Sequence, residues 1–459
     1  MPEMSSIRDL LSRGARLVKD PRLFAACLFG IVAAAITLRF MRIHPALSVV
    51  DEFQYIDAVD KATRWDLVFS GDKTDQYARM LAACRGAGLV PGVTTYMGEC
   101  GGLVPDSSTF IHGYTSADIH SPVYFFVTAW LSQPIQHLLN VELITAARLT
   151  SLLWLWVGMI VLAWFLRRLG AGRYVQFALP IALVAMPVFR LTNSYVTPDA
   201  LNLVAGSLIL GSALMYVRGE WGPWRFILSS SVFAVVKFQN LFAVIAALLF
   251  IGWYGVSTWK FERSSRSIAI EGLPGSIPRV RIGQYVAMTI IPIAFGFTWL
   301  VIRAITAVPV DRPPLDPPAD GELLRSLFAM DDSLQVLFAG TLPMGATAPW
   351  SVFPSLLLWL GVAALFATAL FDVHKDRVQQ SFAASGIVSL LGIGPAIILL
   401  FALVFSVQVG VLNRYVMPLA PLLCFPIAWR MKSSVAQVLL VIFSIVASAY
   451  SLIFAAQPL

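Results

Sequence analysis

Apolar runs of membrane-spanning length recur along this chain and are separated by short polar segments. A helix needs about 20 apolar residues to cross a bilayer, and several runs reach that length. A membrane β-barrel would instead show alternating segments of about ten residues. The pattern therefore predicts an all-α polytopic membrane protein. We find no convincing internal repeat, so the sequence does not support an inverted-repeat transporter.

The apolar runs predict about eleven transmembrane helices. They are expected at residues 23–43, 143–166, 174–191, 198–217, a hairpin over 224–256, 285–305, a run ending at "DVHKDR", 387–407, a run from "LNRYVMP" to "WRMK", and a last run after it. The apolar segment 120–139 is not counted, because polar residues and a proline interrupt its second half. We expect it to lie in the membrane interface as an amphipathic or re-entrant helix.

Charge predicts which way the spans run. Of the 459 residues 13% are charged, against about 25% in a soluble protein, and the net charge is +7. The basic residues cluster in short loops such as "RRLGAGR", which is typical of cytoplasmic loops and gives no indication of nucleic-acid binding. We therefore expect a multi-pass protein of the plasma (inner) membrane with a cytoplasmic N-terminus. Residues 44–142 and 307–349 would then lie outside the cytoplasm.

Two of the four cysteines, Cys84 and Cys100, lie in the long external loop. Because disulfides form in oxidising compartments, we predict a disulfide between them. It would brace a loop that lacks a core of its own. The other two, Cys27 and Cys424, lie in apolar runs and are expected to be small buried hydrophobic residues.

Polar residues that this topology gathers at the outer face are the candidate functional groups. Asp51 and Glu52 follow the first span in "SVVDEFQYIDAVDK", and Asp199 lies at the next external turn. Ionisable groups near a bilayer face are costly and usually face a cavity. Simpler interpretations stay open: the carboxylates are also suitable N-caps, and Arg148 and Arg303 are able to snorkel to headgroups.

Other kinds of site have no sequence signature here. His112, Asp118 and His120 do not have the spacing of metal ligands, so no metal site is predicted. The GxSxG motif of hydrolases, the P-loop and a GxGxxG turn after a strand are all absent from the sequence.

The order of the motifs resembles the integral-membrane GT-C glycosyltransferases, in the branch of protein O-mannosyltransferases and lipid A aminoarabinose transferases. That branch has an acidic residue or pair after the first span, a His-Pro-Pro-Leu-type or Lys-Pro-Pro-Leu-type segment opening an interfacial helix, and an Arg-Leu-x-Ser-Ala-Leu-type second span. A second Asp, a later Lys and a late Arg-Tyr follow. The matching residues are Asp51-Glu52, His120-Ser121-Pro122-Val123, Arg148-Leu149-Thr150-Ser151-Leu152, Asp199, Lys237 and Arg414-Tyr415.

The resemblance implies a GT-C-like bundle that moves a sugar, with inversion, from a polyprenyl-phosphate-sugar donor to an acceptor hydroxyl. A carboxylate has to accept the proton of the attacking hydroxyl, and we expect Asp51 to do so with support from Glu52 or Asp199. Cations have to stabilise the departing phosphate. The donor-binding candidates are Lys237, Arg414, Tyr415, Arg148 and Arg303, and the substrate-loop candidates are His120, Tyr55 and Tyr124.

The expected partners are the lipid donor, a glycan, lipid or protein acceptor, and membrane lipids. No cofactor is required with certainty, and a divalent cation is left open but not favoured. The chain is expected to divide into a cytoplasmic amphipathic N-terminus (1–21), a catalytic transmembrane module (22–306) with external loop 44–142, an external Pro/Asp-rich loop (307–349), and C-terminal transmembrane helices (350–459).

Departures from the family pattern leave the acceptor open. Ser121 replaces the first proline of the Pro-Pro pair, and the loop between Asp51 and His120 is unusually long. Two other classes of function also remain. A transporter or flippase for a polyprenyl-linked or anionic solute would need polar residues through the middle of several spans, and these are scarce. A non-catalytic scaffold would not need carboxylates at two external turns.

Overall fold

The computed structural model describes residues 21–48, 51–87, 100–105, 113–265, 281–309, 349–371, 376–405 and 413–453. The expectations for residues 1–20, for His112 and for most of the loop 307–349 lie outside these ranges. Within them the chain is helical, and β-structure is limited to two isolated bridges, Leu47–Ala87 and Lys73–Tyr114. The predicted all-α class is confirmed for this part of the chain.

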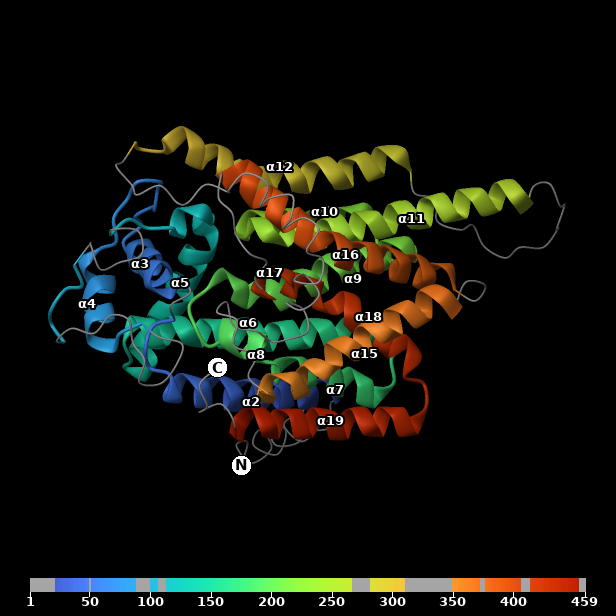
Figure 1. Ribbon diagram of the computed structural model, residues 1–459, viewed down its shortest axis with the longest axis horizontal. Coiled ribbons are helices and arrows are strands. Elements are labelled where there is room, and N and C mark those ends of the chain that lie inside the picture. The colour runs from blue at the N-terminus through green and yellow to red at the C-terminus, as the bar shows by residue number, and fades with distance from the viewer. Residues whose placement is uncertain are drawn as a thin grey trace, which may run out of the picture.

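Figure 1 shows the helices and how they are arranged. In chain order they are α2 (Pro21–Ile43), α3 (Glu52–Thr63), α4 (Gln76–Arg85), η2 (Ala117–Ile119), α5 (Pro122–Leu139), α6 (Leu143–Arg168), α7 (Arg173–Val184), α8 (Pro187–Thr192), η3 (Pro198–Leu201), α9 (Asn202–Val217), α10 (Pro223–Val236), η4 (Phe238–Asn240), α11 (Leu241–Ser265), α12 (Ile282–Thr306), α15 (Pro349–Phe371), α16 (Arg377–Phe405), α17 (Asn413–Val416), η5 (Met417–Leu419), α18 (Ala420–Arg430) and α19 (Ser434–Ile453).

Eight helical segments of the described residues are long and apolar enough to cross a membrane, so the chain is a multi-pass membrane protein. The expected number of eleven is not confirmed. Three of the expected spans are shorter or broken: α7, α10, and the consecutive pieces α17, η5 and α18. The apolar segment 120–139 forms α5, which packs on α3 and α6 and is not among the eight, as the prediction required.

Proline explains where one expected span is broken. Residues 174–191 were expected as one helix, but α7 ends at Val184 and α8 begins at Pro187. The residue before a proline is disfavoured in the helical region. Met186 accordingly has extended backbone angles (φ −73°, ψ 139°), and the helix is interrupted there.

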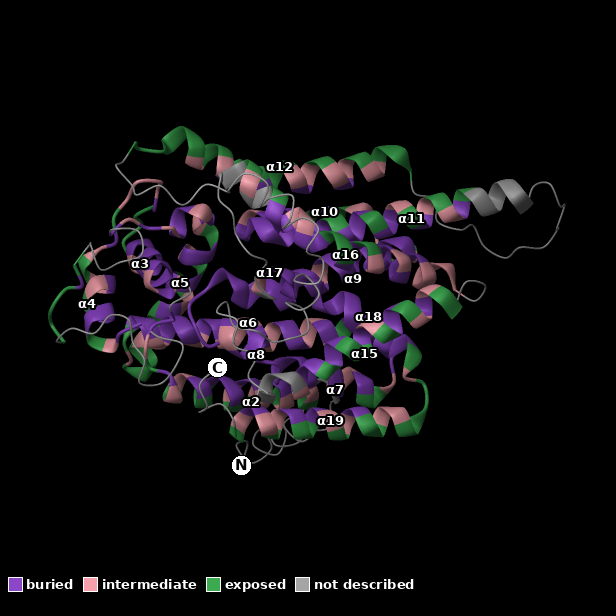
Figure 2. Ribbon diagram, in the orientation of Figure 1, coloured by how far each residue is buried: buried purple, intermediate pink, exposed green. Residues whose placement is uncertain are grey.

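Helix α9 is the centre of the bundle. It contacts α6, α10, α11, α18 and η5, and 94% of the 198–217 segment is buried. Helices α12 and α19 lie at the outside, where only 22% of each span is buried (Figure 2). Residues at the start of α9 are therefore enclosed by neighbouring helices and not by lipid.

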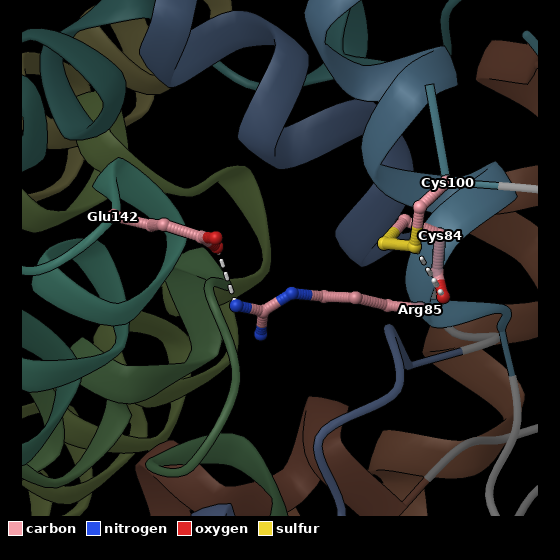
Figure 3. The surroundings of a disulfide bond; sticks show 4 residues. All are labelled: Cys84, Arg85, Cys100 and Glu142. Atoms are coloured by element: carbon pink, nitrogen blue, oxygen red, sulfur yellow. Dashed lines mark hydrogen bonds and ion pairs between the residues drawn. A yellow bond between two sulfur atoms is a disulfide. The ribbon is translucent and has the colours of Figure 1, made fainter. Parts of the chain in front are cut away.

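The segment between α2 and α6 is braced against the bundle on one side. Helices α3, α4 and α5 gather at one end of the long helices (Figure 1). The predicted Cys84–Cys100 pair forms a disulfide, and next to it Arg85 reaches Glu142 at the start of α6 (Nη2 to Oε2, 2.5 Å; Figure 3). These two links tie α4 to the chain after it and to the bundle.

A glycine allows α9 to approach η5 closely. A Cβ added at Gly206 would overlap the backbone carbonyl of Pro418 in η5. One turn earlier on the same face of α9, Asn202 donates a hydrogen bond from Nδ2 to the carbonyl of Arg414 (2.9 Å). The close approach therefore places the segment that carries Arg414 against the start of α9.

We expect Gly206→Ala to lower the free energy of unfolding by about 1–3 kcal/mol, because the backbone of Pro418 has to move. The matched control is Gly283→Ala in the first turn of α12, where nothing lies within 4 Å of the added Cβ. Helix propensity predicts that the control is neutral or slightly stabilising. Thermal unfolding of the purified protein in detergent distinguishes the two, and equal midpoints would contradict this packing.

Candidate active site

Four charged side chains from four separate segments meet where α3 begins. Asp51 precedes α3, Asp199 lies in η3, Lys237 stands between α10 and η4, and Arg414 belongs to α17. Ion pairs connect them in a row, from Asp51 to Arg414, from Arg414 to Asp199, and from Asp199 to Lys237. Two carboxylates and two cations balance one another, as charges removed from water must.

Asp51 has an uncommon backbone conformation, with φ 64° in the left-handed region. This region is uncommon for a residue with a side chain, although Asp adopts it more readily than most, and residues held in it cluster at active sites. Asp51 occupies the N-cap position of α3, but its side chain makes no capping hydrogen bond. Its Oδ2 instead accepts from Arg414 (3.0 Å) and from the Tyr55 hydroxyl (3.4 Å). A helix cap therefore does not account for this carboxylate, which is 32% exposed.

Asp199 is buried and its oxygens are occupied. Its Oδ1 accepts from Lys237 and from Asn202 Nδ2 (3.0 Å), and its Oδ2 accepts from the Thr197 hydroxyl (3.0 Å). The cap of η3 is Thr197, whose Oγ1 accepts from the backbone N–H of Asp199 (3.2 Å). Asp199 is thus arranged to hold cations in place, and the N-cap interpretation does not fit it.

Arg414 bridges the two carboxylates over an aromatic ring. Its Nη1 lies 3.7 Å from Asp199 Oδ2, and its guanidinium carbon is 5.2 Å from the ring centroid of Tyr415. The Lys237 ammonium lies 5.5 Å from the same centroid. The negative face of an aromatic ring attracts cations, so Tyr415 helps to keep both groups together.

Tyr55 and His120 extend the cluster toward α5. The Tyr55 hydroxyl lies 3.0 Å from His120 Nε2. Burial, together with the nearby charge of Lys237, lowers the pKa of His120 to about 3, so this imidazole is neutral at pH 7. Burial and the charge of Asp51 raise the pKa of Tyr55 well above its usual value. Tyr55 has one proton to donate. Both hydrogen bonds of its hydroxyl form when His120 donates to Tyr55 and Tyr55 donates to Asp51.

Glu52 and Arg148 form a second, separate ion pair beside the cluster. Both are buried, and Arg148 donates from Nε and Nη2 to the two oxygens of Glu52 (2.8 Å each). Glu52 also accepts from the backbone N–H groups of Ser48 (2.8 Å) and Val196 (2.9 Å). Arg148 also donates hydrogen bonds to backbone carbonyls of the segment between α2 and α3. This geometry suits positioning, and neither group is presented to a substrate.

The other predicted groups are not members of the row of four charges. Arg303 in α12 donates from Nε to Asp118 Oδ2 (2.7 Å), and Trp299 donates to the Asp118 carbonyl (2.8 Å), which fastens α12 to η2. Tyr124 in α5 is 1% exposed and meets Phe125 edge-on, so it has no open ring face. Among the described residues, no group of three His, Cys, Asp or Glu side chains is arranged to hold a metal ion.

The sequence did not single out two polar residues of this site, Asn202 and Thr197. Asn202 joins Asp199 to the carbonyl of Arg414, and Thr197 both caps η3 and donates to Asp199. The signal was present in "TPDALN", because residues three apart share a helical face. An apolar helix that begins with two polar side chains on one face, here Asp199 and Asn202, indicates a polar contact at that end.

Comparison with known proteins identifies no family for the chain. No protein-family model and no curated protein matches it. Among solved structures it is similar to ArnT from Cupriavidus metallidurans, bound to undecaprenyl phosphate (TM-score 0.49, 14% identity) and in the apo state (TM-score 0.48, 16% identity). Each match covers 91% of this chain, but the chain spans only 62% and 61% of the ArnT chain.

At these scores the likeness carries no argument for a shared activity. The function of this chain has to be inferred from its own residues.

Because Glu52 neutralises a buried arginine, we expect Glu52→Gln to lower the free energy of unfolding by about 3–5 kcal/mol. The matched control is Glu142→Gln, since Glu142 is 64% exposed and its ion pair with Arg85 is a surface contact. Such pairs contribute about 1 kcal/mol or less. Denaturant or thermal unfolding in detergent measures both variants. Equal losses of stability would show that the Glu52–Arg148 pair has no special structural role.

Proposed function

We propose that this chain is an integral-membrane glycosyltransferase that transfers a sugar from a polyprenyl-phosphate-sugar donor to an acceptor hydroxyl. The observation that carries the proposal is the row Asp51, Arg414, Asp199 and Lys237, in which one accessible carboxylate stands beside two cations. A general base and a phosphate-stabilising pair are the two elements that this reaction requires. The order of motifs in the sequence supports the same reaction class.

Asp51 is the proposed general base. The acceptor oxygen attacks the anomeric carbon, its proton passes to Asp51, and the bond from that carbon to the phosphate oxygen breaks. Attack from the face opposite the phosphate inverts the configuration of the sugar. Of the two carboxylates in the row, Asp51 has the exposed one, with its side chain 32% exposed against 3% for Asp199.

Arg414 and Lys237 are the proposed stabilisers of the departing polyprenyl phosphate. In the resting site Arg414 is paired with Asp51. When Asp51 accepts the proton it becomes neutral, and Arg414 is released to the negative charge that develops on the phosphate. The attraction is then stronger in the transition state than in the ground state, which is the condition for catalysis. Asp199 pairs with both Lys237 and Arg414 and keeps them in position, and this role does not require it to change its protonation state.

Charge supports an extracytoplasmic site. Arg167 and Arg168 end α6, whereas Arg148, near the start of α6, contacts the segment that carries Asp51. Basic residues concentrate at the cytoplasmic ends of spans. The end of the bundle that carries Asp51 is therefore the one proposed to face away from the cytoplasm.

We expect Asp51→Asn to reduce transfer about 100-fold to 10,000-fold, the range that a general base contributes. Asp66→Asn is the matched control, because Asp66 is an exposed carboxylate of the same loop. The assay follows radiolabelled sugar from polyprenyl-phosphate sugars into cell-envelope acceptors, with folding checked by size-exclusion chromatography.

Asp199→Asn is expected to lose activity as well, because Lys237 and Arg414 lose the anion that holds them. Full activity in both Asp51→Asn and Asp199→Asn would overturn the assignment. Lipid or solute crossing the bilayer with no glycosidic bond formed by the unsubstituted protein would favour the transporter alternative instead.

A further inference from the structure

A cavity of about 890 Å³ lies at the other end of the bundle, between α2, α6 and α7. It is lined by the start of α2, the last two turns of α6 and the first turn of α7. Helix α2 has 23 residues and is therefore about 35 Å long at 1.5 Å per residue. Asp51 follows the far end of α2, so this cavity is separate from the candidate active site.

The lining combines an apolar wall with three guanidinium groups. Phe29, Phe177 and alanine side chains form the wall, and Arg167, Arg168 and Arg173 line the cavity at the helix ends. The volume falls within the range of about 300–1,000 Å³ that is usual for small-ligand sites. Such a lining fits a ligand with one anionic end and one apolar end.

Two of the three arginines are available to a ligand. The guanidinium groups of Arg167 and Arg173 make no hydrogen bond or ion pair with any residue that the structure describes, and both residues are exposed. Arg168 is held in place, since it lies over the ring of Trp164 (5.3 Å) and pairs with Glu220 (3.6 Å). The site therefore has an oriented cation flanked by two others that have no partner among the described residues.

We propose that this cavity binds an anionic diacyl phospholipid, with the phosphate at Arg167, Arg168 and Arg173 and an acyl chain against the apolar wall. Guanidinium groups bind phosphate oxygens in a bidentate manner. Basic pockets between membrane helices on the cytoplasmic side are suited to anionic headgroups. Trp164 lines the cavity and is 38% exposed, so the wall reaches the surface of the bundle.

A general excess of positive charge at this face would not need a cavity. Cytoplasmic loops attract anionic lipids wherever they carry arginine. Binding in the cavity would depend on the arginines that line it and on the apolar wall, and not on the total positive charge of this face. Substitutions of other basic residues at the same face, and of an uncharged residue of the wall, separate the two explanations.

The test uses the full chain, purified in detergent and titrated with phosphatidylglycerol or phosphatidylcholine under native mass spectrometry. We expect the protein to retain phosphatidylglycerol in preference to phosphatidylcholine. Arg167→Gln together with Arg173→Gln is expected to weaken that binding about 5-fold for each arginine, the ratio that corresponds to the roughly 1 kcal/mol of a basic residue at an anionic surface.

Two controls distinguish the cavity from the surface. Arg225→Gln with Arg281→Gln removes the same charge from exposed residues outside the cavity and should leave binding unchanged. Ala163→Phe fills the apolar wall without changing charge and should weaken binding. An equal effect of the two arginine pairs, or unchanged binding in Ala163→Phe, would overturn the proposal.

The same titration with undecaprenyl phosphate and with inorganic phosphate identifies the source of the phosphate. Arginine-dependent retention of undecaprenyl phosphate in place of phosphatidylglycerol would overturn the assignment to a phospholipid. Equal competition by inorganic phosphate would show that the apolar wall takes no part. Because the readout is lipid binding, its failure does not affect the proposed transfer reaction.

Discussion

The buried carboxylate of Glu52 is the contact on which the end of the bundle that carries the candidate site depends. It accepts four hydrogen bonds, two from Arg148 in α6 and one each from the backbone of Ser48 and Val196. These groups belong to three segments that are distant in sequence. Glu52 adjoins Asp51, and Val196 lies just before η3, which carries Asp199. A single saturated carboxylate thereby sets the separation of the two acidic residues of the candidate site.

Charge neutrality in a low-dielectric environment explains why the ionisable groups occur in matched sets. An unpaired charge buried in protein or lipid costs several kcal/mol. Glu52 is matched by Arg148, and Asp51 and Asp199 are matched by Arg414 and Lys237. The first set is saturated, whereas the second keeps one partly exposed carboxylate. The first set therefore suits a positioning role. The second set is able to accept a proton at its exposed carboxylate and to bind an anion at its cations.

Close packing of α9 places the late part of the chain against the early part. The lack of a side chain at Gly206 lets η5 approach, and Asn202 joins Asp199 to the backbone of Arg414. Asp51, at the start of α3, is then 3.0 Å from a guanidinium 363 residues further along the chain. The proposed reaction needs both groups at one anomeric centre, so this contact is the structural basis of the site.

The sequence by itself determined the all-α membrane class, the positions of most long helices, the exclusion of segment 120–139 from the candidate spans and the Cys84–Cys100 pair. These properties depend on the composition of a local stretch of sequence or on two residues in one loop, and both can be read directly from the sequence. The sequence also pointed to Asp51, Asp199, Lys237 and Arg414 as candidates. Only the tertiary structure decided which of them pair with one another, and it separated Glu52 and Arg148 from that row. Such roles depend on hydrogen-bonding capacity, because an oxygen that already accepts bonds from groups 96 and 144 residues away is no longer free for a substrate.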